Sequence, residues 1–225
     1  KTTALLDIMK KAIVLLSGGQ DSATCLAIAN KKFKTSIHTV AFDYGQRHVV
    51  ELDMASKLAK VAGVSFEVID LSFISKLSKN ALTDDSLAIS HGQNDLPNTF
   101  VPGRNLFFLA TAGVIARREG AGTIYTGVCQ TDFSGYPDCR ADFIASMETT
   151  INQAMESSTV IKTPLMYLTK AETVKKMVAL GCLEWYGFTH TCYEGVRPGC
   201  LKCPACILRK KGFDEAGFKD PLFYD

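Results

Sequence analysis

The chain has 225 residues, of which 47% are hydrophobic and 21% charged, with a formal net charge of +2 at pH 7. This size and composition are typical of a globular protein with one well-buried domain and an appendage, or with two small domains. The nearly neutral charge argues against a dedicated nucleic-acid-binding protein. No apolar stretch approaches the roughly 20 residues that cross a bilayer. We find no secretory leader, so we expect a cytoplasmic protein with reduced cysteines.

The first predicted strand, Ala12–Leu16, is followed directly by Ser17-Gly18-Gly19-Gln20-Asp21-Ser22. The two glycines let the backbone turn sharply and approach a ligand closely, because no Cβ stands in the way. A helix predicted over Ser22–Lys31 would point its first N–H groups at an anion held in this turn. The lysine of a Walker loop is missing, and the segment instead matches the PP-loop, S-G-G-x-D-S, of enzymes that split ATP between its α and β phosphates. The alternative is an ordinary strand-to-helix turn in which Ser and Asp act as caps.

Strands and helices alternate along the rest of the chain. Apolar, β-branched runs predict strands over Ser36–Phe42, Ser65–Leu71 and Thr123–Gly127. Apolar residues at helical spacing predict helices over Val49–Ala62, Asn105–Glu119 and Asp142–Ser157. A capping box, Thr169-Lys170-Ala171-Glu172, predicts a further helix that runs to about Ala179, with Gly181 after its last turn.

This alternation predicts an α/β fold with a mostly parallel sheet that is covered by helices on both faces. The polar stretch Ser72–Phe100 shows little periodicity, and we expect it to be a long, partly mobile insertion that acts as a lid. In such sheets, ligands bind beyond the carboxyl ends of the strands. Three further polar segments are expected there, so we predict that they and the PP-loop form one active site: Asp43–His48, Pro102–Asn105 and Gln130–Asp138.

Four cysteines follow the pattern C-x7-C-x2-C-x2-C, namely Cys192, Cys200, Cys203 and Cys206. Such spacing favours a structural, tetrahedral zinc site, and we predict a zinc-binding region over residues 181–225 after a nucleotide-binding domain over residues 9–180. One alternative is an iron–sulfur cluster, because Cys203-Pro204 lies in a ferredoxin-like C-x2-C-x2-C run. Another is a set of reactive thiols for sulfur transfer. His190 is a possible replacement for one ligand.

Taken together, these motifs resemble the 7-cyano-7-deazaguanine synthase family of PP-loop enzymes. The resemblance extends from Met9 to about Gly212, with one departure at Gln130, where an acidic residue often follows the cysteine. It rests on the PP-loop, the four cysteines and four further segments: Phe42–His48, Pro97–Asn105, Thr126–Cys129 and Thr131–Arg140. It implies a Rossmann-like fold of the adenine nucleotide alpha hydrolase type, which is often a homodimer.

The activity that this resemblance implies is that of an ATP-dependent carbon–nitrogen ligase. It would convert 7-carboxy-7-deazaguanine and ammonia to 7-cyano-7-deazaguanine, in queuosine precursor biosynthesis, by way of an acyl-adenylate and an amide. The residues that would bind ATP are Leu16, Ser17, Gly18, Gly19, Gln20, Asp21, Ser22 and Phe42, with the adenine along Val40–Phe42.

The expected catalytic residues are Asp21, Arg104 and Lys162. Asp21 would lie beside Mg²⁺, because its carboxylate would otherwise repel the phosphates; its alternative is helix capping. Arg104 would hold a carboxylate or a phosphate through two parallel hydrogen bonds, and Lys162 would stabilise developing phosphate charge. The alternative for both is a solvent-facing side chain. Arg47 and His48 are likewise either anion-binding residues of the site or solvent-facing side chains.

The flat deazaguanine has a donor-rich edge that suits carboxylate acceptors. Asp132 and Asp138 are the expected pair, with the ring between Phe133 and Tyr136; the alternative is a solvated loop. Two other functions are weighed against the synthase. A PP-loop tRNA sulfurtransferase would need a basic RNA-binding surface, and a non-catalytic nucleotide sensor would bind ATP without turnover. We find no glutaminase domain, so ammonia is expected to arrive free or from a partner.

Overall fold

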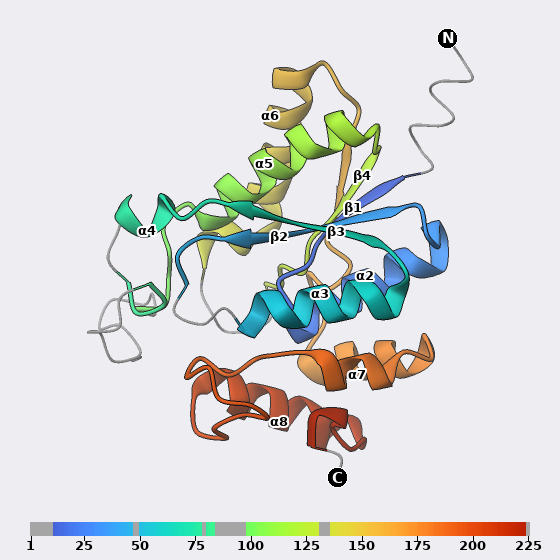
Figure 1. The fold of residues 1–225 in the computed structure, drawn as a ribbon, viewed down its shortest axis with the longest axis vertical. Coiled ribbons are helices and arrows are strands. Elements are labelled where there is room, and N and C mark those ends of the chain that lie inside the picture. The colour runs from blue at the N-terminus through green and yellow to red at the C-terminus, as the bar shows by residue number, and fades with distance from the viewer. Residues whose placement is uncertain (1–10, 47–49, 78–79, 84–97, 131–135, 224–225) are drawn as a thin grey trace.

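The computed structural model describes residues 11–46, 50–77, 80–83, 98–130 and 136–223. Five strands form a parallel sheet in the order β3-β2-β1-β4-β5 (Figure 1). The strands are β1 (Ala12–Leu15), β2 (Ile37–Asp43), β3 (Ser65–Asp70), β4 (Thr123–Tyr125) and β5 (Val160–Lys162). The predicted α/β class with a parallel sheet is therefore confirmed.

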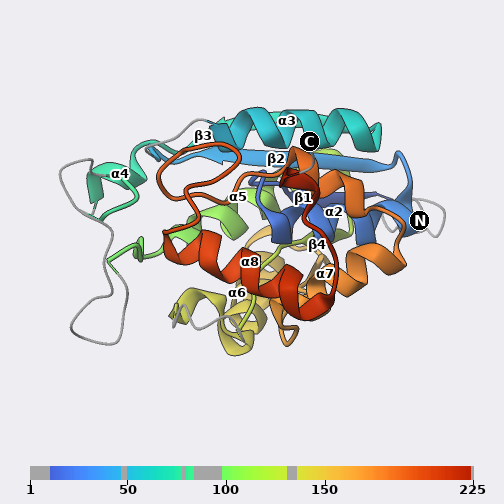
Figure 2. The same ribbon diagram turned by 90° about the horizontal axis from the view of Figure 1, so that it is seen from below.

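Helices cover both faces of the sheet (Figure 1). On one face lie α5 (Arg104–Glu119) and α6 (Ala141–Met155), and on the other lie α2 (Gln20–Phe33) and α3 (Val50–Ala62). Beyond α2 and α3, α7 (Lys170–Ala179) and α8 (Pro204–Ala216) pack against each other as a further layer (Figure 2). The short elements are α4 (Ile74–Leu77), η1 (Pro137–Cys139), η2 (Leu183–Phe188) and η3 (Pro221–Phe223).

The central strand shows why this arrangement is stable. Successive side chains of β1 point to opposite faces of the sheet, so Ile13 and Leu15 join the core beneath α5 and α6, whereas Val14 and Leu16 join the core beneath α2 and α3. A parallel strand that is buried on both faces requires a continuous apolar run, which Ala12–Leu16 supplies.

The strand order also fixes where a ligand can bind. From β1 the chain continues to β2 and β3 on one side, and it then returns to β4 on the other side of β1. The connections that leave the carboxyl ends of β1 and β4 therefore diverge. In open α/β sheets this switch point is the usual ligand crevice.

The predicted elements agree with the structure to within two or three residues, although the short elements α4, η1, η2 and η3 were not predicted. The capping box is confirmed, since Thr169 Oγ1 accepts the Glu172 N–H at 3.2 Å and the Glu172 carboxylate accepts the Thr169 N–H at 2.8 Å. Gly181 follows α7 with a φ of +68°. The three residues of β5 and the helix α8, directly after the third cysteine of the cluster, were not predicted.

The stretch Ser72–Phe100 begins with α4 and is anchored by buried side chains, Ile74 and Ala81. Residues 78–79 and 84–97, on which the predicted lid depends, lie outside the described part of the chain. None of the described helices is long and apolar enough to span a membrane.

Candidate active site

A cavity of about 380 Å³ lies at the carboxyl ends of β1, β2 and β4. Its lining comes from the PP-loop, the end of β2, the first turns of α3 and α5, the segment after β4 and the C-terminal region. Thus residues from distant parts of the sequence surround the switch point of the sheet. The volume is within the range of small-molecule sites, about 300–1,000 Å³.

The PP-loop has the backbone shape that its glycines predict. Gly18 has a φ of +83°, and a Cβ at this position would lie 2.2 Å from the Glu51 carbonyl oxygen. The helix α2 begins at Gln20 with Gly19 as its N-cap, and within the described part of the chain this N-cap has no side-chain capping hydrogen bond. The interpretation of Ser and Asp as helix caps is therefore wrong. An uncapped helix N-terminus facing a cavity suits an anion.

Asp21 lines this cavity and is paired with a lysine that the sequence analysis did not single out. The Nζ atom of Lys170 donates to Asp21 Oδ2 at 2.6 Å, and the two side chains are 13% and 29% exposed. Lys170 is the first residue of α7, directly after the N-cap Thr169. By contrast, Lys162 is exposed at the end of β5 and does not line the cavity.

Arg104 also faces the cavity, at the first position of α5. Its guanidinium lies 5.7 Å from the centroid of the Tyr44 ring, which is a cation–π distance. Burial opposes its charge, but the neighbouring Tyr44, Asp138 and Tyr136 raise the pKa of the guanidinium overall. Arg104 is thus a cation held inside the site rather than a solvent-facing helix residue.

Glu51 is a second carboxylate on the cavity wall that sequence reasoning missed. Burial raises the pKa of its carboxyl group to about 7, although Arg104 works in the opposite direction. The signal was present in the sequence: Glu51 occupies the same stripe of α3 as the buried Ala55 and Leu58, where an apolar residue would be expected.

The proposed substrate residues divide into three groups. Tyr136 lines the cavity, its ring stacks on Phe100 with centroids 5.5 Å apart, and its hydroxyl lies 2.6 Å from Thr99 Oγ1. Asp138 does not line the cavity; its Oδ2 accepts the Asn105 N–H at 3.1 Å and so caps the start of α5. Outside the described residues lie Asp132, Phe133, Arg47 and His48.

The end of β2 forms an apolar wall of the cavity. Val40, Ala41 and Phe42 line it, as the adenine assignment requires. The Phe42 ring stacks on Phe108 with a centroid distance of 4.4 Å and an interplanar angle of 21°. A flat ligand would therefore meet a rigid surface here.

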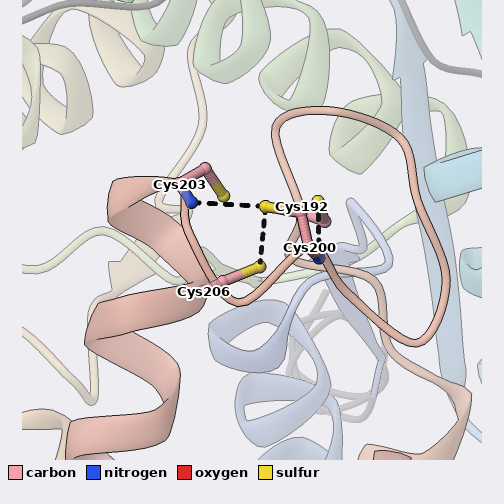
Figure 3. Close-up of side chains that lie close together, drawn as sticks. All are labelled: Cys192, Cys200, Cys203 and Cys206. Carbon is pink, nitrogen blue, oxygen red and sulfur yellow. Dashed lines mark hydrogen bonds between the residues drawn. The ribbon is translucent and has the colours of Figure 1, made fainter.

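The four cysteines of the C-terminal region come together, as Figure 3 shows. Their sulfur atoms all lie within 4.8 Å of one another, and Cys200 Sγ is 4.0 Å from Cys206 Sγ. The backbone N–H of Cys203 donates to Cys200 Sγ at 3.2 Å. Tetrahedral zinc, with Zn–S bonds of about 2.3 Å, holds its sulfurs at nearly this separation.

This geometry fits one small ion, whereas an iron–sulfur cluster would hold its thiolates farther apart. All four positions of a tetrahedral zinc ion would be filled by protein sulfur, which is the arrangement of a structural site. His190 does not belong to the group; its Nε2 lies 2.9 Å from the Cys192 carbonyl oxygen. The cluster therefore fits the predicted zinc site.

The cysteine-bearing region also forms part of the cavity. The backbone N–H of His190 donates to the Gly18 carbonyl oxygen at 2.8 Å and so ties this region to the PP-loop. Thr191, Tyr193 and Arg209 line the cavity from this side. Residues from both predicted regions, 9–180 and 181–225, therefore form the wall of one cavity.

The parallel sheet, the PP-loop at its switch point and the adjoining cavity define a PP-loop protein of the Rossmann-like α/β class. The family model described as "Queuosine biosynthesis protein QueC" matches residues 11–217. The chain belongs to the QueC family, which confirms the resemblance drawn from its motifs.

Two relatives are similar over nearly their whole length. The 7-cyano-7-deazaguanine synthase of Chromobacterium violaceum is 51% identical over 217 residues, which cover 95% of this chain and 93% of the relative. The 7-cyano-7-deazaguanine synthase of Lysinibacillus sphaericus is 52% identical over 209 residues, which cover 92% of this chain and 95% of the relative.

Among solved structures, the U34-tRNA thiolase NcsA from Methanococcus maripaludis with its [4Fe-4S] cluster matches with a TM-score of 0.45 and 14% identity. The match covers 91% of this chain but 64% of the thiolase chain. This similarity is too low to bear on the function of the chain.

Proposed function

We propose that the chain is a 7-cyano-7-deazaguanine synthase, an ATP-dependent carbon–nitrogen ligase that converts 7-carboxy-7-deazaguanine and ammonia to the nitrile. The observation that carries this proposal is the identity of 51% and 52% to two synthases over 95% and 92% of the chain. The cavity beside the PP-loop supports it, because the reaction needs a nucleotide and a flat acid in one site.

The PP-loop supplies the first part of the chemistry. A carboxylate is a poor electrophile, and joining it to AMP creates a good leaving group. Ser17, Gly19 and Ser22, together with the uncapped N-terminus of α2, would hold the departing pyrophosphate. Adenine would lie along Val40–Phe42, with Leu16, Gly18 and Gln20 completing the nucleotide site.

Asp21 would hold Mg²⁺, which neutralises phosphate charge when bound. A carboxylate oxygen is a suitable ligand for this ion, and Asp21 Oδ2 already faces a cation, the Lys170 ammonium. Lys170, once released from Asp21, would contact phosphate oxygens. Independently of Lys170, Lys162 would stabilise the developing phosphate charge.

Arg104 would hold the substrate carboxylate, since its guanidinium lies at the cavity wall and neighbouring groups favour its charged form. Tyr136 would cover one face of the deazaguanine ring. Asp132 and Asp138 are the predicted acceptors for the donor edge of the ring and Phe133 its second cover, although Asp138 would have to serve both the ring and Asn105.

Other parts of the proposal concern the whole protein. We propose a nucleotide-binding domain over residues 9–180 and a zinc-stabilised region over residues 181–225, with the zinc ion in a purely structural role. The enzyme would use ammonia that arrives free or from a partner, bind no nucleic acid and act in the cytoplasm as a homodimer.

The test is mass spectrometry of the purified protein with 7-carboxy-7-deazaguanine, ammonium, Mg²⁺ and ATP. We expect a product with the nitrile mass, accompanied by AMP rather than ADP. Without ammonium, the protein should still exchange labelled pyrophosphate into ATP when the acid is present. If ATP stays intact in both assays, the synthase proposal is wrong.

A further inference from the structure

Among the described residues, Asp21 and Glu51 are the carboxylates that line the cavity. Asp21 is held by Lys170 at 2.6 Å and lies at the phosphate loop. Glu51 is placed differently, on the first turn of α3, at the start of the stripe that faces the core. The two carboxylates therefore have different surroundings, and the synthase mechanism outlined above uses only the first.

The surroundings of Glu51 place it where the acyl-adenylate would form. Its backbone oxygen packs against Gly18, so its own turn of helix touches the phosphate loop. Its carboxylate interacts electrostatically with Arg104, the proposed partner of the substrate carboxylate. Glu51 and Arg104 line the same cavity as the PP-loop, so the bond between the acyl carbon and the phosphate would form in the space that all three border.

We propose that Glu51 is the proton acceptor that converts ammonium to ammonia beside the acyl-adenylate, an inference that rests on the proposed synthase function. At neutral pH ammonia in water is almost entirely ammonium, which has no lone pair with which to attack. A carboxylate in this position would take its proton inside the site.

Ammonium gives one proton to the Glu51 carboxylate and becomes NH₃, whose lone pair forms a C–N bond with the acyl carbon. The bond between that carbon and the phosphate oxygen breaks, and AMP leaves with the electron pair. The nitrogen releases a second proton to water to give the neutral amide, and Glu51 later returns its proton to solvent.

The groups around Glu51 favour this role. Its titratable and charged neighbours in the described residues are Arg104 of α5, Tyr44 after β2 and Tyr193 of the C-terminal region. Burial raises the pKa of Tyr44, so this side chain is a neutral hydroxyl at pH 7. A carboxyl group with a pKa of about 7 is suited to accept a proton at that pH.

The principal test is Glu51→Gln, which keeps the shape of the side chain but cannot accept a proton. With ammonium at pH 7, we expect kcat to fall about a hundredfold or more, while KM for the acid and for ATP stays near the wild-type value. Pyrophosphate exchange without ammonium should persist. Hydroxylamine, which is largely unprotonated at neutral pH, should form the hydroxamate at nearly the wild-type rate.

Two further variants serve as controls. Glu51→Asp retains a carboxylate and should recover part of the lost rate with ammonium. Asp53→Asn changes an exposed acid on the same helix, outside the cavity lining, and should leave every rate unchanged. The kcat profile of the wild type with ammonium should show an inflection near pH 7 that is absent from Glu51→Gln.

A stability measurement tests the surroundings of Glu51 independently of activity. Because the folded pKa is raised from 4.5 to about 7, the folded state favours the protonated carboxyl group. Its ionisation therefore weakens the fold progressively as pH rises between these values, and the penalty is constant above them. We expect Glu51→Gln to melt at a higher temperature than the wild type at pH 8, with the difference disappearing near pH 4.

Three results would overturn the inference. A raised KM for the acid with unchanged kcat would mean that Glu51 binds the ring, and loss of pyrophosphate exchange would mean that it acts in adenylation. An equal defect with ammonium and hydroxylamine would exclude proton acceptance. If the wild type itself catalyses no exchange with the acid, the proposed function fails instead, so the two failures are distinguishable.

Discussion

At the level of single side chains, the ion pair between Lys170 and Asp21 links the phosphate loop to the start of α7. Both side chains remain partly exposed to solvent, which screens the pair, so its contribution to stability is about 1 kcal/mol. Its larger effect concerns phosphate binding, because Lys170 is a cation already placed at the loop. In a desolvated site, a fixed positive charge next to developing phosphate charge stabilises the transition state strongly.

We therefore predict that Lys170→Ala lowers the rate of pyrophosphate exchange by about a hundredfold or more. Its melting temperature should change little. The matched control is Lys176→Ala, which removes an exposed lysine from the same helix and should leave exchange unaltered. Exchange at the wild-type rate in Lys170→Ala would remove this residue from the reaction.

The site residues that could be predicted from the sequence lie in or beside local motifs, whereas those that were missed depend on tertiary contacts. Asp21 and the loop glycines lie in one contiguous motif, and Arg104 directly precedes a helix that was predicted from Asn105. Lys170 is 149 positions from the carboxylate that it contacts, so its role depends on tertiary structure. Glu51 interrupts the apolar stripe of α3, which the sequence does show, but the PP-loop and Arg104 that it meets come from other elements and depend on the packing of α3.

At the level of elements, the first turn of α3 and the PP-loop fit together without spare room. The Cα of Gly18 faces the carbonyl oxygen of Glu51, and its φ of +83° lies in the left-handed region. Any side chain here would push α3 away from the loop. Gly181 has a similar φ of +68°, but a Cβ there would meet nothing within 4 Å. A substitution at Gly181 therefore tests backbone strain alone, whereas one at Gly18 tests strain together with crowding.

We predict that Gly181→Ala lowers the free energy of unfolding by about 1–2 kcal/mol, the cost of a left-handed alanine. Gly18→Ala should cost about 1–3 kcal/mol more, because it adds overpacking to the same strain. It should also weaken ATP binding, which Gly181→Ala should not. Denaturant titration and calorimetric ATP binding measure both effects; equal losses in the two variants would contradict the crowding argument.

Element prediction succeeded where a local pattern was complete and failed where it was short. The run Ala12–Leu16 and the capping box at Thr169 each contain enough residues to identify a strand and a helix start. In contrast, β5 has three residues and depends on pairing with β4 for its existence. The helix α8 begins with Pro204 directly after a cysteine of the cluster. Its first turns were interpreted as part of the metal-ligand pattern, so the helix was not predicted.

At the level of the whole molecule, the C-terminal region is part of the active site rather than a separate appendage to it. The N–H of His190 is bonded to Gly18, and Thr191 and Tyr193 line the cavity on the chain segment that includes Cys192. A metal ion held by the four cysteines would therefore fix the position of one cavity wall. Without the ion, four close thiols would have no bond to hold them together, and this wall should loosen.

We predict that removing the metal, by chelation or by Cys203→Ser, weakens ATP binding as well as the fold. Losing even about 2 kcal/mol of stability would lower the melting temperature of a chain of this size by about 4–8 °C. Because the wall contacts the PP-loop directly, ATP affinity should fall at temperatures where the protein is still folded. Metal content, calorimetric ATP binding and circular dichroism on the same sample separate these effects. Cys182→Ser, outside the cluster, should keep both metal and affinity, whereas a folded, metal-free protein with wild-type ATP affinity would show that the wall does not depend on the ion.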